Sequence, residues 1–69
     1  MENGTRIQTI TQFIAASTDP ITGERLASRP TVKKGAKGTV ESVNGNYAIV
    51  KFDSLRIRQQ ILARALKAI

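Results

Sequence analysis

The sequence predicts a mainly β fold, a small barrel or strongly bent antiparallel sheet followed by a C-terminal α-helix. Two observations support this fold class. Residues 33–52, KKGAKGTVESVNGNYAIVKF, place an Asn-Gly pair between two runs rich in β-branched and aromatic residues, which is typical of a β-hairpin. Residues 59–69 instead repeat apolar side chains at helical spacing. At 69 residues, the chain is expected to form one domain, residues 1–69.

The predicted core is small. A domain of this size buries only about 60% of the surface that its unfolded chain exposes. The chain has no cysteine and no histidine, so neither a disulfide nor a Cys/His zinc site can reinforce the fold. We therefore expect a core that is either packed efficiently or completed by a partner.

Residues 5–16, TRIQTITQFIAA, fit two periods. Polar and apolar or β-branched residues alternate from Ile7 to Phe13, as in a strand, but Ile7, Ile10 and Ile14 also fall on one helical stripe. The many β-branched residues favour a strand, because such side chains fit a pleated surface well. A helix remains the alternative.

Residues 17–31, STDPITGERLASRPT, form the least apolar stretch of the chain. The pairs Asp19-Pro20 and Thr22-Gly23 indicate turns, because proline fixes φ and glycine admits positive φ. This segment is predicted to be a long surface loop. Loops of this length without secondary structure are uncommon in compact domains and are often binding loops or disordered.

Side-chain patterning favours one register for the hairpin. A three-residue loop that pairs Val43 with Tyr47 places Val40, Val50 and Phe52 on the same face, which is then the core. A two-residue Asn-Gly turn would shift the pairing and distribute these apolar residues over both faces. The longer loop is therefore the predicted one.

The predicted C-terminal helix, residues 59–69, has good helix formers between its apolar positions. It would cover an apolar patch left on the other side of the hairpin, formed by Val43, Tyr47 and Ile49. The preceding LRIR, residues 55–58, alternates and is interpreted as a short closing strand, although the helix could also begin before it.

Residues 35–58, GAKGTVESVNGNYAIVKFDSLRIR, resemble a KOW-type strand-turn-strand, in which glycine precedes a Gly-x-Val strand and a Val-x-Phe strand ends at Asp or Gly. The upstream GTRIQTI and the later VKKGAKGTV are similar to motifs of small bacterial SH3-like barrels, such as those among the accessory proteins of photosystems and the variable chain of ferredoxin-thioredoxin reductase. The matching residues are Gly4, Arg6, Ile7, Gly35, Gly38 and Val40. The resemblance implies an SH3-like barrel, and the C-terminal helix departs from the minimal barrel.

Charge indicates a polyanionic partner. Eleven Lys and Arg against five Asp and Glu give a net charge of +6, which attracts polyanions. KOW-type families often contact RNA or its machinery, so the resemblance implies the same class of partner. Eight candidate residues for nucleic-acid binding, RNA or DNA, are Lys33, Lys34, Lys37, Lys51, Arg25, Arg29, Arg56 and Arg58. Because the chain has only three aromatic residues, we expect contacts to the phosphate backbone with little sequence reading. The alternative for the lysines is a solvated sheet edge that deters aggregation.

A second function remains open, that of an accessory or adaptor protein within a larger assembly. The photosynthetic barrels imply such a role, with the barrel face and loop 17–31 docking onto a larger protein complex. The C-terminal helix could also form a homodimer through Leu62, Leu66 and Ile69.

Catalysis is not expected. The chain has no histidine and only five scattered carboxylates, which is a poor inventory for acid-base chemistry. No carboxylate spacing resembles a calcium loop, and no cofactor or metal site is predicted. The sequence shows neither a membrane span nor the features of a signal peptide, so we expect a cytoplasmic protein.

Overall fold

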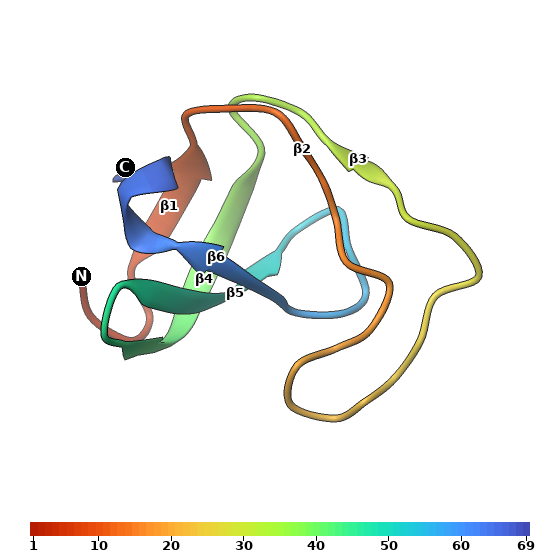
Figure 1. Ribbon diagram of the computed structural model, residues 1–69. Coiled ribbons are helices and arrows are strands. Elements are labelled where there is room, and N and C mark those ends of the chain that lie inside the picture. Colours follow the sequence, from red (N-terminus) through yellow and green to blue (C-terminus); the bar gives the residue numbers. More distant parts are fainter.

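The computed structural model describes residues 1–69 and is mainly β (Figure 1). The elements in chain order are β1 (Arg6–Thr9), β2 (Phe13–Ile14), β3 (Thr31–Val32), β4 (Lys37–Asn44), β5 (Tyr47–Phe52), β6 (Gln59–Leu62), the 3-10 turn η1 (Ala63–Ala65) and β7 (Leu66–Ala68). Five strands form one antiparallel sheet in the order β6-β5-β4-β1-β7, and β2 pairs with β3 in a separate two-stranded sheet. Strands β6 and β7 are therefore the two edges of the larger sheet, and they do not pair with each other.

The core lies on one face of the five-stranded sheet. Val40, Val50 and Phe52 are buried there with Ile7 of β1, as the predicted hairpin register requires. Phe13 of β2 packs against this cluster, with its ring centroid 5.9 Å from that of Phe52. The two-stranded sheet thus covers part of the core that the larger sheet leaves open.

The hairpin register is confirmed at its base and wrong at its tip. Val40 pairs with Val50 as predicted, but a β-bulge follows between Val40 and Ser42. Beyond the bulge the pairing shifts by one residue, so that Asn44 lies opposite Tyr47 across a two-residue turn. Gly45 opens this turn with φ of +62°, a conformation that glycine adopts without steric cost. A two-residue turn with regular pairing would place Val40 out of register with Val50. The extra residue of the bulge shifts the pairing back by one, so Val40 lies opposite Val50 and faces the core.

Gly38 has a different role from that of the turn glycine. A Cβ atom at this position would lie 2.8 Å from the Lys51 carbonyl oxygen and 3.0 Å from the Phe52 Cα. Both are backbone atoms, so they cannot move aside as a flexible side chain could. Glycine at position 38 therefore permits β4 and β5 to approach closely.

The predicted C-terminal helix is wrong. Residues 59–69 form β6, the turn η1 and β7 instead. Strand β7 pairs with the edge of β1, where Leu66 lies opposite Thr9 and is buried. Pairing along β1 and burial of Leu66 thus override the helical spacing of the apolar residues. Residues 55–58 form bends and not the short strand that we expected.

Two consequences follow from the missing helix. Val43 and Tyr47, which it was expected to cover, are 39% and 45% exposed. The helix through which we expected a possible homodimer is also absent, and Leu66, one of its three expected contact residues, packs in the core of its own chain.

Residues 5–16 contain no helix and form two short strands, β1 and β2, separated by a bend at residues 10–11, where one strand was expected. The connection between β2 and β3, residues 15–30, matches the predicted long loop closely and extends away from the five-stranded sheet in Figure 1. Its chain folds back on itself at a bridge between Thr18 and Arg25. Although most of its residues are exposed, Ala15 and Asp19 are buried and anchor it.

Candidate nucleic-acid interface

Carboxylates form their ion pairs with arginines in this structure, and no lysine forms an ion pair, although Lys51 and Lys37 lie close enough to Asp53 to help lower its pKa. Asp53 forms an ion pair with Arg6, Glu24 with Arg56, and both Asp19 and Glu41 with Arg58. Glu2 alone among the five carboxylates has no ion pair. The free positive charge therefore comes from the lysines and from the arginines outside these pairs.

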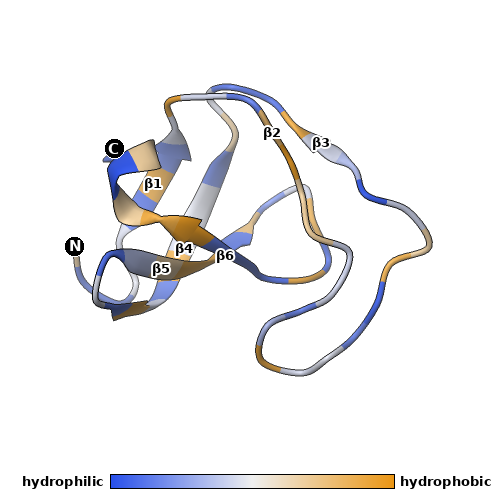
Figure 2. Ribbon diagram, viewed as in Figure 1, coloured by the Kyte–Doolittle hydropathy of each residue, from blue (hydrophilic) through white to orange (hydrophobic).

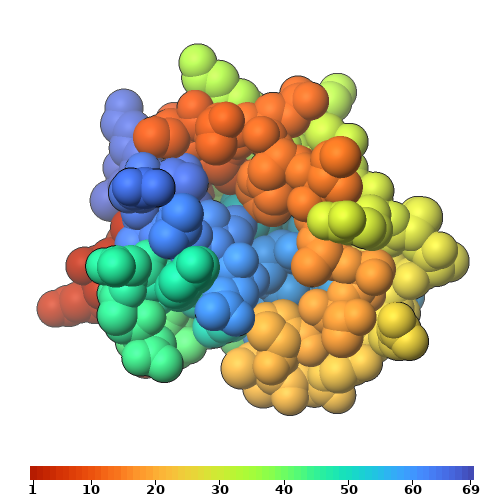
Figure 3. All heavy atoms as spheres, in the orientation of Figure 1, coloured from red at the N-terminus to blue at the C-terminus, as the bar shows by residue number.

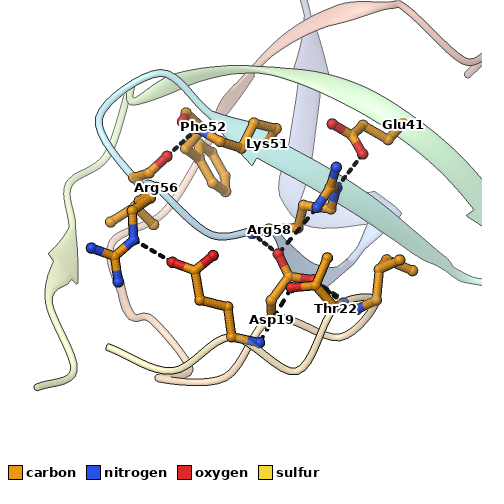
Figure 4. A network of polar contacts seen from close by, with 10 residues as sticks. Asp19, Thr22, Glu41, Lys51, Phe52, Arg56 and Arg58 are labelled. Carbon is orange, nitrogen blue, oxygen red and sulfur yellow. Dashed lines mark hydrogen bonds and ion pairs between the residues drawn. The ribbon is translucent and has the colours of Figure 1, made fainter. Parts of the chain in front are cut away.

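Asp19 is the centre of the largest polar network (Figure 4). Its Oδ1 accepts hydrogen bonds from the backbone N–H groups of Ile21 and Thr22, at 2.7 and 2.9 Å. Its Oδ2 accepts one from the backbone N–H of Arg58 at 2.9 Å and another from the Arg58 guanidinium at 3.3 Å. The second ion pair of that guanidinium is with Glu41 of β4. The network ties the long loop to the segment between β5 and β6.

The environment of Asp19 favours its charged form. Burial alone would raise the pKa of this carboxyl, but the hydrogen bonds from the backbone N–H groups of Arg58, Thr22 and Ile21 and from the Arg58 guanidinium outweigh burial, so the pKa lies well below its ordinary value. Asp53 behaves similarly at the surface, where the hydrogen bonds from Arg6 lower its pKa. Both groups are structural anions.

Four of the eight predicted cations are used within the fold. Arg56 and Arg58 form the ion pairs described above, and Arg29 donates from Nε to the carbonyl oxygen of Ala15 at 2.9 Å. The ammonium group of Lys51 donates to the carbonyl oxygens of Phe52 and Leu55. These four side chains hold the loops in place, so they are poorly suited to bind a phosphate.

The other four predicted cations are exposed and make no ion pair. Lys33 and Lys34 lie in the turn between β3 and β4, Lys37 begins β4, and Arg25 lies in the long loop. The turn with Lys33 and Lys34 is held against the end of β1, because the N–H of Gly35 donates to the Thr9 carbonyl at 2.9 Å. The structure brings the three lysines together at one end of β1 and β4 and leaves Arg25 apart from them.

Strand register adds a lysine that sequence reasoning missed. Gln8 of β1 lies opposite Lys37 on β4 and opposite Lys67 on β7. Residues directly opposite in antiparallel strands project from the same face, so Lys37, Gln8 and Lys67 form a row, with the lysines about 10 Å apart across β1. This face is opposite to the one that buries Ile7 and Val40. We call Lys37 and Lys67 on this face, together with Lys33 and Lys34 in the adjoining turn, the lysine face.

Register also corrects one interpretation of the lysines. Strand β4 is interior to the sheet, so Lys37 does not protect a sheet edge, as the alternative interpretation requires. Lys67 is the member of the lysine face that lies on an edge strand. Its place could have been found only by recognising residues 66–68 as a strand, which their helix-like spacing concealed.

Aromatic side chains offer little to a nucleic acid at this face. Phe52 is fully buried and Phe13 is half-buried against it. Tyr47 is the exposed aromatic residue, and it lies at the tip of the β4–β5 hairpin. Stacking of several successive bases has no platform here.

No protein-family model, curated protein or solved structure matches this chain. The structure contains no helix of the length and apolar character needed to cross a membrane. It also contains no group of three or more acidic, histidine or cysteine side chains placed to hold a metal ion.

Proposed function

We propose that this protein is a non-enzymatic binding module that contacts the phosphate backbone of nucleic acids with little sequence preference. The observation that carries the proposal is the lysine face, where Lys37 and Lys67 lie in one row across β1, Lys33 and Lys34 lie in the adjoining turn, and all four are exposed and form no ion pair. Unpaired lysines on one surface attract phosphates and release condensed counterions when they bind them. A cytoplasmic location belongs to the same proposal.

The finer fold assignment is part of this proposal. The strand order β6-β5-β4-β1-β7, the long connection that contains β2 and β3, and the 3-10 turn before the last strand support an SH3-like barrel with a KOW-type β4–β5 segment. Fold likeness does not choose a function. The functional proposal therefore depends on the lysine face and not on the barrel.

Electrophoretic mobility shift with random-sequence RNA and DNA at two salt concentrations tests this function. We expect both nucleic acids to be retained at low salt and released as salt rises, with similar affinities for unrelated sequences. If neither RNA nor DNA is retained even at low salt, the proposal is wrong.

A further inference from the structure

The open side of the sheet contains a groove between β2 and β6. It has a volume of about 300 Å³, and its apolar lining includes Phe13, Ile14, Ile61, Leu62 and Ala65. Figure 2 shows the apolar segments of β2 and β6 that face one another across it, and Figure 3 shows the hollow between the orange atoms around β2 and the blue atoms of β6. The groove is a separate surface from the lysine face, since none of those four lysines lines it.

Backbone hydrogen-bonding groups point into this groove from β6. The N–H of Ala63 donates to the carbonyl oxygen of Asn46 at 2.8 Å, in line with the β5–β6 register. Because antiparallel residues alternate between facing their partner strand and facing away from it, Gln59 and Ile61 bond to β5. Gln60 then directs its N–H and C=O groups to the free edge, and Leu62 directs its N–H there, while the C=O of Leu62 serves the turn η1.

The edge of β2 presents the same arrangement. The N–H of Ala15 donates to the carbonyl oxygen of Pro30 at 2.8 Å, next to the β2–β3 pairs. By the same alternation, the backbone groups of Ile14 point away from β3. No hydrogen bond outside the strand ladders uses the backbone of Ile14 or Gln60 or the N–H of Leu62, whereas the carbonyl of Leu62 belongs to the turn η1. Two strand edges with free backbone groups therefore face one apolar groove.

At one end of the groove, a side-chain amide already bonds to the backbone edge that follows β2. The side chain of Gln59 accepts from the N–H of Ala16 at 2.9 Å through Oε1 and donates to the carbonyl oxygen of Ala16 at 3.1 Å through Nε2. This pair of bonds is the one that a residue of a neighbouring strand would make. Ala16 follows Ile14 by two residues, so it lies on the same edge of the chain.

We propose that this groove binds an extended peptide segment of a partner protein, which adds a strand between β2 and β6. Main-chain hydrogen bonds to Gln60, Leu62 and Ile14 supply affinity, and alternate apolar side chains of the peptide enter the groove. Arg29 lines the groove, and although its Nε is held by the Ala15 carbonyl, its two terminal guanidinium nitrogens make no hydrogen bond or ion pair, so the peptide carries a carboxylate that reaches them. A second copy of the chain is a poor occupant, because each copy has a net charge of +6.

A synthetic seven-residue peptide, Asp-Ile-Glu-Val-Glu-Leu-Asp with blocked ends, is the probe. We expect its titration into the ¹⁵N-labelled full chain to shift the amide signals of Ile14, Gln60 and Leu62. A scrambled peptide that clusters the three apolar residues is the composition control, and it is expected to bind at least about fivefold more weakly. Signal shifts confined to Lys33, Lys34, Lys37 and Lys67 would show that the acidic peptide binds the lysine face by charge alone and not the groove, and would overturn the proposal.

Gln60→Pro is the decisive variant. Proline removes the N–H that faces the groove and spares the β5–β6 ladder, which an edge strand tolerates. We expect about a five- to tenfold loss of peptide affinity, whereas Gln60→Ala stays within about twofold. A well-dispersed spectrum confirms that Gln60→Pro is folded. Unchanged affinity in the folded variant would overturn the proposal.

A peptide in which alternate amides are N-methylated tests strand addition without any change to the protein. It retains the side chains and loses the donors along one edge, so it should bind the wild-type chain at least about fivefold more weakly than the unmethylated peptide. Equal binding of the methylated peptide would exclude strand addition. A dimer by analytical ultracentrifugation, with the groove signals shifted in the absence of peptide, would show that a second copy occupies the groove and would also overturn the proposal.

Discussion

Lys37 and Lys67 lie on the same face of the sheet, on the two strands that flank β1. Gln8 of β1 is paired with both of them. Neither lysine forms an ion pair, whereas three arginines, Arg6, Arg56 and Arg58, pair with four of the five carboxylates. All four ion pairs of the chain are therefore made by arginines, whereas Lys37 and Lys67 face solvent.

Replacement of Asp19 by asparagine should loosen the long loop. The buried carboxylate accepts hydrogen bonds from three backbone N–H groups and from Arg58, and an amide offers only one acceptor oxygen. We expect Asp19→Asn to lower Tm by about 5–15 °C and to expose residues 15–30 to limited proteolysis. Thermal unfolding by circular dichroism and mass mapping of the cleavage sites provide the measurements.

Glu24→Gln is the matched control for Asp19. It also removes a carboxylate of the long loop, but the ion pair of Glu24 with Arg56 is largely exposed. Such pairs contribute little, so Tm should change by less than about 3 °C. Equal losses in the two variants would show that Asp19 does not anchor the loop.

The stability of the fold should fall at acid pH and be nearly constant at neutral pH. The pKa values of Asp19 and Asp53 are lowered in the folded chain. A carboxyl with a depressed pKa stabilises the fold above its unfolded value of about 3.9 and loses that contribution as pH falls through the folded value. No histidine is present to titrate between pH 5 and 8. We expect a level Tm down to about pH 5, a decline below about pH 4, and a shallower decline for Asp19→Asn.

Gly38→Ala should weaken the hairpin. The added methyl group meets two backbone positions of β5, at Lys51 and Phe52, so the strands must separate slightly. Overpacking of this kind costs about 1–3 kcal/mol, which urea unfolding measures. Thr39→Ala, at the neighbouring position, loses only one side-chain hydrogen bond, from Arg6, and should cost less. A Gly38→Ala variant as stable as the wild type would contradict the close approach of β4 and β5.

Val50→Asp should unfold the domain. Val50 is fully buried on the interior strand β5, and an unpaired buried carboxylate costs several kcal/mol, on the order of the whole stability of a small domain. The chemical-shift dispersion of a ¹⁵N spectrum reports the loss. Tyr47→Asp, on the same strand but 45% exposed, should remain folded. A folded Val50→Asp would mean that the register at the base of the hairpin is wrong.

Local patterns predicted the central part of this fold. The β-branched runs and the pairing of Val40 with Val50 identified the base of the hairpin, because side-chain alternation determines which face is buried. The bulge after Val40 was missed, since Glu41 and Ser42 are both polar and either can be the extra residue of an alternating strand. Residues 59–69 were misassigned because their helical spacing is compatible with a strand, a 3-10 turn and a second strand once β1 offers an edge.

The candidate site could be predicted only in part. Lys33, Lys34 and Lys37 were found because they lie close together in the sequence. The capture of Arg58 by Asp19 and of Arg56 by Glu24 joins residues 39 and 32 positions apart, and no local pattern reports such pairs. Lys67 was missed for the same reason, since only the pairing of β7 with β1 brings it beside the other lysines.

The salt dependence of nucleic-acid affinity tests the role of the lysine face most directly. The comparison is between Lys37→Ala/Lys67→Ala and Arg25→Ala/Arg64→Ala, which removes the same charge from exposed residues outside that face. Each phosphate contact contributes a slope of about 0.7–0.9 in log K against log salt. We predict that the lysine variant flattens the slope by about 1.4–1.8 for random RNA or DNA and that the arginine variant changes it by less than about 0.5. Equal slopes for the two variants would show that net charge alone attracts the nucleic acid and would contradict the assignment of the lysine face.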